Sequence, residues 1–151
     1  MNSLGNKIKE AAPGKAGQAV PRLSFKRVTL SETGMTASTR EYEAVRTAGG
    51  ARVSLYDGPW NYHEGTKRED CLQARKEGGE AFYLELAAKF AALGIASWDG
   101  FNGSNPHVLD GTMFSFEAEL KNGSVIHAHG SNAFPQNYGA FTDYLWNLLK
   151  S

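Results

Sequence analysis

Apolar and polar residues alternate along the first half of the chain, which is the pattern of β-strands with one buried face. Three such runs follow one another with turn residues between them: 23–30, about 36–47, and 51–56. Strands joined by short turns pair in antiparallel order, so these runs predict a three-strand meander. A three-residue loop at 48–50 would place Val45 opposite Val53.

Two later stretches repeat apolar residues at the three- and four-residue spacing of a helix that is buried on one side. The stronger one spans 80–93, and Gly94 follows it where a helix end favours a residue with positive φ. The second begins near 137–138. A shorter, polar helix is predicted from residue 66, because residues 66–69 have the form of a capping box; the glycines at 78–79 would end it.

A hairpin is predicted between the two main helices, from strands at about 112–121 and 124–130. A two-residue turn would set Ala118 opposite His127 and would mix polar and apolar residues on both faces. A three-residue loop that ends on a glycine in the left-handed bulge position sets Ala118 opposite Ile126 instead. The sequence therefore predicts the three-residue loop, with one apolar and one polar face.

Strands and helices are grouped along the chain rather than alternating, and this order is typical of an α+β fold. We expect an antiparallel sheet of about five strands (a three-strand meander, a helix, then a hairpin), with two main helices packed on one face. Residues 23–151 would form this single domain. Residues 1–22 carry few large apolar side chains and predict a flexible tail, with a short helix at 8–12 as the alternative.

Composition and charge add mainly exclusions. The 151-residue chain has 16 basic and 16 acidic side chains, so no overall field favours nucleic acid or an anionic membrane. No apolar run reaches membrane-spanning length, and the N-terminal stretch lacks the apolar segment of a secretory signal. Cys71 is the only cysteine, which fits a reducing compartment. We expect a soluble, cytoplasmic protein without a cofactor and without a nucleic-acid or membrane partner; the oligomeric state stays open.

His127-Ala128-His129 is the clearest chemical motif. Two residues apart on one strand, both imidazoles point to the same face, as in strand pairs that supply two of three zinc ligands. The third ligand would come from a short set of side chains: Glu117, Glu119, His63 or His107. The simpler interpretation is that His127 forms an exposed pair with Glu117 across the strands. A catalytic zinc needs three protein ligands, and only two are arranged here. The sequence therefore predicts neither a metal site nor a catalytic role for the two histidines.

The remaining candidates lie in loops rich in aromatic and turn-forming residues, at 57–63, 98–110 and 130–138. Such aromatics can form a recognition surface, since Trp and Tyr anchor many interfaces. They can equally pack over the ends of the sheet as part of the core, and the sequence leaves both interpretations open. The candidate binding residues are Trp60, Tyr62, Trp98, Asp99, Phe101, His107, Asp110, His129, Asn132 and Tyr138.

The last third of the chain carries a connected pattern of short motifs. It reads Trp98-Asp99-Gly100-Phe101, then Asp110-Gly111 with Phe114-Ser115-Phe116, then Ala128-His129-Gly130-Ser131-Asn132-Ala133-Phe134-Pro135. This pattern resembles a family of small, uncharacterised bacterial proteins. The resemblance implies a bacterial origin and brings no activity or ligand with it.

Two functions stay open from the sequence. Aromatic-rich loops without a reaction motif favour a non-enzymatic module that binds a protein or peptide partner, of an accessory or immunity type. The alternative is a metal-dependent or hydrolytic enzyme that uses His127 and His129 with a nearby carboxylate such as Glu117 or Asp110.

Overall fold

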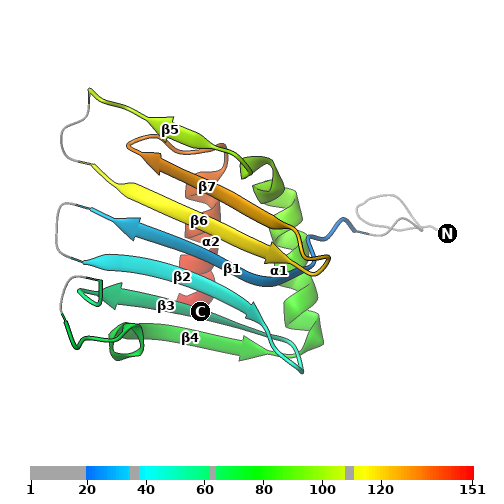
Figure 1. The fold of residues 1–151 in the computed structure, drawn as a ribbon. Coiled ribbons are helices and arrows are strands. Elements are labelled where there is room, and N and C mark those ends of the chain that lie inside the picture. Colours follow the sequence, from blue (N-terminus) through cyan, green and yellow to red (C-terminus); the bar gives the residue numbers. More distant parts are fainter. Residues whose placement is uncertain (1–19, 35–37, 62–63, 108–110) are drawn as a thin grey trace.

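One mixed sheet with two helices on one of its faces makes up the fold in the computed structural model, which describes residues 20–34, 38–61, 64–107 and 111–151 (Figure 1). Within these residues the seven strands are β1 (Phe25–Thr33), β2 (Thr39–Arg46), β3 (Ala51–Gly58), β4 (Leu72–Gly78), β5 (Asn102–Ser104), β6 (Met113–Leu120) and β7 (Val125–Ser131). The helices are α1 (Glu80–Leu93) and α2 (Tyr138–Lys150), with short 3-10 helices η1 (Arg68–Cys71) and η2 (Ile95–Trp98). The strand order is β4-β3-β2-β1-β6-β7-β5. The predicted α+β class is confirmed, whereas residues 1–19 of the predicted tail lie outside the described residues.

The core lies between the sheet and the helices, because alternate residues of the central strands point to that side. Leu30 of β1 and Phe116 of β6 are directly opposite each other there and are fully buried. Phe90 of α1 and Phe141 of α2 meet over them, with their ring centroids 5.5 Å apart. The helical spacing of apolar residues therefore predicted both helices correctly.

Gly94 ends α1 in the left-handed conformation that the sequence predicts, with φ of 71°. Its amide donates to the carbonyls of Phe90 and Ala91, which satisfies groups that the helix end would otherwise leave unpaired. The chain then turns directly into η2, whose first residue, Ile95, is fully buried.

The register of the β6–β7 hairpin is the one predicted from alternation. Ala118 lies opposite Ile126 and Glu117 opposite His127, across the loop at 121–123. Gly123 has φ of 94° and donates its amide to Leu120, 2.9 Å away. One face of the hairpin is therefore buried and the other exposed, with both histidines on the exposed face.

The expectation of about five antiparallel strands is corrected in two places. Leu72–Gly78, expected in a short polar helix, is an edge strand paired with β3, and only Arg68–Cys71 is helical. The second missed strand is β5, which pairs with β7 in parallel order and makes the sheet mixed. Both missed strands are polar edge strands, and pairing along one edge places little demand on hydrophobic alternation.

The predicted pairing of Val45 with Val53 is wrong by one residue. The β2–β3 loop has four residues, 47–50, so Ala44 lies opposite Val53 and Val45 points to the other face. Thr47 closes this loop, because its hydroxyl accepts a hydrogen bond from the Gly50 amide at 3.0 Å and its amide donates to the Gly50 carbonyl at 2.9 Å. The expected three-residue loop at 48–50 is thus longer by Thr47, whose bonds to Gly50 close the loop.

Neither helix in the described part of the chain is long and apolar enough to cross a membrane.

Candidate functional site

The sheet face opposite the helices carries polar side chains, because the residues between the core positions point to this side. Cross-strand neighbours bring them into rows. One row runs through Ser54, Glu43, Thr29, Glu117 and His127, and the next through Tyr56, Glu41, Ser31, Ser115, His129 and Asn102. We call this the polar face.

Two carboxylates on β2 are buried within the polar face. Glu43 is 2% exposed and Glu41 is 8% exposed. Arg68 of η1 reaches across both of them, with Nη1 2.6 Å from Glu41 Oε2 and 3.4 Å from Glu43 Oε2. Arg27 also pairs with Glu43. The two guanidinium groups thus offset the charge of two carboxylates that would otherwise be costly to bury.

Arg68 is held in place by more than its ion pairs. Its guanidinium carbon lies 4.2 Å from the centroid of the Tyr56 ring. Partial burial opposes its charged form, but the hydrogen bond to Glu41 and the charge of Glu43 outweigh this effect and raise the pKa of Arg68. Arg68 in this way fixes η1 onto the polar face.

A second set of side chains in the same half of the polar face is joined by hydrogen bonds. Arg75 of β4 donates to Ser54 Oγ at 2.8 Å and to the Tyr56 hydroxyl at 2.9 Å. The Tyr56 hydroxyl in turn donates to Glu69 at 2.8 Å. This hydrogen bond and the nearby arginines lower the pKa of Glu69. These four side chains are therefore hydrogen-bonded to one another, whereas the buried Nε of Arg52, in the same half, has no partner in the described residues.

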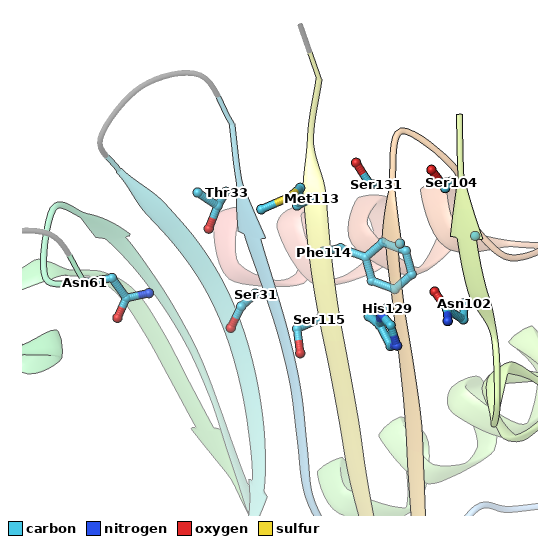
Figure 2. Close-up of a pocket in the computed structure, with 12 residues that line it drawn as sticks. Ser31, Thr33, Asn61, Asn102, Ser104, Met113, Phe114, Ser115, His129 and Ser131 are labelled. Carbon is cyan, nitrogen blue, oxygen red and sulfur yellow. The ribbon is translucent and has the colours of Figure 1, made fainter. Parts of the chain in front are cut away.

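The other half of the polar face contains an open groove of about 560 Å³, where β1, β6, β7 and β5 lie side by side (Figure 2). Its lining is Ser31, Thr33, Asn61, Asn102, Gly103, Ser104, Met113, Phe114, Ser115, His129, Gly130 and Ser131. This lining contains no Asp, Glu, Lys or Arg. Met113 is 57% exposed at one end of it. The groove thus presents hydrogen-bonding groups and an apolar side chain, with no acidic or basic side chain in its lining.

Five of the polar side chains in the groove have no hydrogen-bond partner within the described part of the chain: Asn102, Ser104, Ser115, His129 and Ser131. They come from three neighbouring strands, β6, β7 and β5. At the β1 side, in contrast, the Ser31 hydroxyl donates to Glu41 at 2.6 Å, and Asn61 donates to Thr39 at 3.1 Å. Unused hydrogen-bonding capacity is therefore concentrated at the β5 end of the groove.

A repeated tripeptide builds this end. Gly103-Ser104-Asn105 in and after β5 and Gly130-Ser131-Asn132 in and after β7 have the same sequence. They lie side by side in parallel, with Gly103 opposite Gly130 and Ser104 opposite Ser131. The two serines consequently stand next to each other on the polar face.

Gly103 and Gly130 of the repeat leave no room for a side chain, because other residues pack closely against the opposite face of the sheet at both positions. A β-carbon on Gly103 would lie 2.7 Å from the Phe101 ring, and one on Gly130 would lie 2.3 Å from the carbonyl oxygen of Ala133. Contacts this short do not occur, so any side chain here would displace the aromatic packing behind the groove.

Three of the predicted binding residues are packing residues in this structure. Trp98 is 1% exposed; its ring centroid is 4.8 Å from that of Phe116, and its Nε1 donates to the Gln136 carbonyl at 2.8 Å. Tyr138 is also buried, and Phe101 packs against the core. For these residues the geometry matches the second interpretation of the loop aromatics, in which they close the end of the sheet.

The other predicted binding residues have varied surroundings. Of those that the structure describes, only His129 lines the groove. Asp99 accepts a hydrogen bond from a backbone amide of β7, and the half-buried Trp60 has an indole Nε1 without a partner in the described residues. Asn132 has φ of 59° and donates its amide to the Thr112 carbonyl at 3.0 Å. His107 is exposed, while Tyr62 and Asp110 lie outside the described residues.

His127 and His129 share the polar face, as predicted, and Glu117 lies opposite His127. Among the described residues, no three side chains of His, Cys, Asp or Glu gather closely enough to hold a metal ion. Glu119, one of the possible third ligands, instead lies 3.8 Å from Lys26 Nζ. His63, another of them, lies outside the described residues.

Several groove residues were not among the predicted binding residues, although two features of the sequence indicate them. The predicted hairpin register already places Ser115 opposite His129. The repeated Gly-Ser-Asn tripeptide marks the positions of Ser104 and Ser131. Asn102 and the three serines resemble ordinary turn residues when each is considered alone, because Ser and Asn are common in turns.

No protein-family model matches the chain, and neither a curated protein nor a solved structure matches it. Its function must therefore be inferred from the groove.

Proposed function

We propose that this protein is a non-enzymatic binding module that holds a segment of a protein or peptide partner in the groove on its polar face. The observation that carries the proposal is the division of that face into two halves. In the β2–β3–β4 half, Arg68 and Arg75 bond to polar groups of the same face, whereas the groove half keeps five polar side chains without a partner in the described residues. A role as a bacterial accessory or immunity-type protein would fit such a module.

The size and chemistry of the groove support a peptide segment as the ligand. Its volume of about 560 Å³ falls within the range of about 300–1,000 Å³ of small-molecule sites, so a few side chains of a peptide fit in it. Hydroxyl and amide side chains both donate and accept hydrogen bonds, as the peptide group does. Exposed Met113 is flexible and polarisable, and it can pack against side chains of different shape.

The proposal is tested by panning a library of displayed random peptides against the purified full chain. Selected peptides are then measured by titration against Ser115→Arg and Glu117→Arg. Both substitutions are at exposed positions on the same face of β6, but only Ser115 lines the groove. We expect Ser115→Arg to weaken binding by about tenfold or more and Glu117→Arg to leave it within about twofold.

Thermal unfolding of both variants checks that each is folded. Failure to select any peptide that binds above background would contradict the proposed function, as would equal loss of binding in the two variants.

A further inference from the structure

The two edges of the sheet differ in how they are protected from pairing with another chain. The β4 edge carries three consecutive charged residues, Arg75, Lys76 and Glu77. Charges of this kind on an edge strand discourage pairing with a foreign strand. The opposite edge is β5, whose residues are Asn102, Gly103 and Ser104, so it carries no charge.

The outer side of β5 has backbone groups that no other strand among the described residues uses. The His129 amide donates to the Phe101 carbonyl at 3.0 Å, and the Asn105 amide donates to the Ser131 carbonyl at 2.9 Å. Residues 101, 103 and 105 therefore direct their backbone groups toward β7. Because these groups alternate sides along a strand, the N–H and C=O of Asn102 and Ser104 point outward, at the end of the strand order (Figure 1).

These outward groups adjoin the groove. The side chains of Asn102 and Ser104 line its β5 end, next to His129 and Ser131 (Figure 2). A chain that paired with β5 would direct every second side chain toward the polar face, beside the same residues. Backbone pairing and side-chain contact are thus available to one ligand at the same time.

We propose that the partner segment binds in an extended conformation, as an additional strand along the outer edge of β5, with alternate side chains directed over the polar face into the β5 end of the groove. This inference rests on the proposed function. Two pairs of outward N–H and C=O groups, about 7 Å apart, repeat at the spacing of an extended polypeptide. The uncharged edge and groove favour an uncharged segment, since a charged side chain would lose hydration there without gaining a counter-charge.

The test measures amide hydrogen exchange by NMR on the full chain, free and with a peptide selected by panning. In the free protein the amides of Asn102 and Ser104 face solvent, whereas those of His129 and Asn105 are already bonded and serve as internal controls. We expect exchange at Asn102 and Ser104 to slow by about tenfold or more on binding, and exchange at the two controls to change little.

A second measurement uses the same peptide with single N-methyl groups placed along its backbone. N-methylation removes one donor and blocks strand pairing, so binding should be lost at alternate positions only. In one outcome the peptide binds and Ser115→Arg disrupts that binding, while exchange at Asn102 and Ser104 stays unchanged. This result would overturn the edge-pairing inference and leave the proposed function intact.

Two other outcomes also overturn the inference. One is binding of neutral oligosaccharides, but no peptide, in the groove, which would contradict the proposed function too. The other is a concentration-dependent dimer in light scattering that protects Asn102 and Ser104 without any peptide, which would assign the edge to a second copy of this chain.

Discussion

The carboxylate of Asp99 accepts a hydrogen bond from the backbone amide of His127, with Oδ1 and N 3.0 Å apart. The carbonyl of the same His127 accepts from the Gly100 amide at 2.8 Å. Both backbone groups of His127 are therefore held by the two residues that precede Phe101 and β5. This pair of bonds determines where the chain joins the edge of the sheet and, with it, where Asn102 is placed in the groove.

Substitution of Asp99 should loosen β5 more than the remainder of the fold. Asp99→Ala removes the acceptor, and we expect it to lower the free energy of unfolding by about 1 kcal/mol, the net value of one such hydrogen bond. Asp99→Asn keeps an oxygen at the same place and is the matched control. Urea unfolding gives the stability, and hydrogen exchange at the His129 amide reports on β5 itself. Equal effects of the two substitutions would contradict a role for the Asp99 oxygen.

The sequence predicted those elements whose burial has a clear period. Leu86 and Phe90 of α1, and Phe141 and Leu145 of α2, are all buried at the positions that helical spacing selects. Ala118 and Ile126 are opposite each other because any other loop length would have mixed the two faces of the hairpin. In these elements the hydrophobic effect alone selects one arrangement.

The remaining elements are held by interactions that leave no period in the sequence. β4 is held by backbone pairing with β3 and by contacts such as that of Arg75 with Ser54, so its residues resemble a polar helix. β5 exists because a second Gly-Ser-Asn tripeptide lies beside β7, and it is too short to show alternation. Of the groove lining, His129 was among the predicted binding residues; Ser31 and Thr33 were not, because they lie in a part of β1 where the sequence suggested a turn.

Removal of Arg68 should destabilise the protein more than removal of an exposed cation. Arg68→Ala leaves Glu41 and Glu43 buried with Arg27 as the remaining cation. Breaking a buried ion pair costs about 3–5 kcal/mol, and the partial exposure of Arg68 reduces our expectation to about 2–3 kcal/mol. Urea unfolding at neutral pH measures the loss.

Lys26→Ala is the control for this prediction, because Lys26 and its partner Glu119 are both about half exposed and 3.8 Å apart. We expect it to change stability by less than about 0.5 kcal/mol. Adding Glu41→Gln to Arg68→Ala should recover part of the lost stability, since Arg68 is the cation that pairs with Glu41 and its loss leaves that carboxylate uncompensated. If the double variant is no more stable than Arg68→Ala, the loss does not come from the buried carboxylates.

Tyr138, the first residue of α2, donates its hydroxyl to Glu32 Oε2 of β1 at 2.5 Å. Burial raises the pKa of Tyr138 far above its ordinary value, and the hydrogen bond to Glu32 and the charge of that carboxylate raise it further. Burial is also the main cause of the raised pKa of Tyr42 and of Tyr144. The folded state therefore favours the neutral phenol at these positions.

The Tyr138 relationship predicts a loss of stability at alkaline pH. Below about pH 10 both folded and unfolded chains keep the Tyr138 proton; above it the unfolded chain releases the proton and the folded chain retains it, so stability falls. Urea unfolding from about pH 8 to about pH 11.5 should show that the free energy of unfolding declines in both proteins. The decline should be steeper in the wild type than in Tyr138→Phe, by up to about 1.4 kcal/mol per pH unit. A residual decline in Tyr138→Phe is expected from Tyr42 and Tyr144. Equal slopes in the two proteins would show that the Tyr138 hydroxyl is not held neutral by the fold.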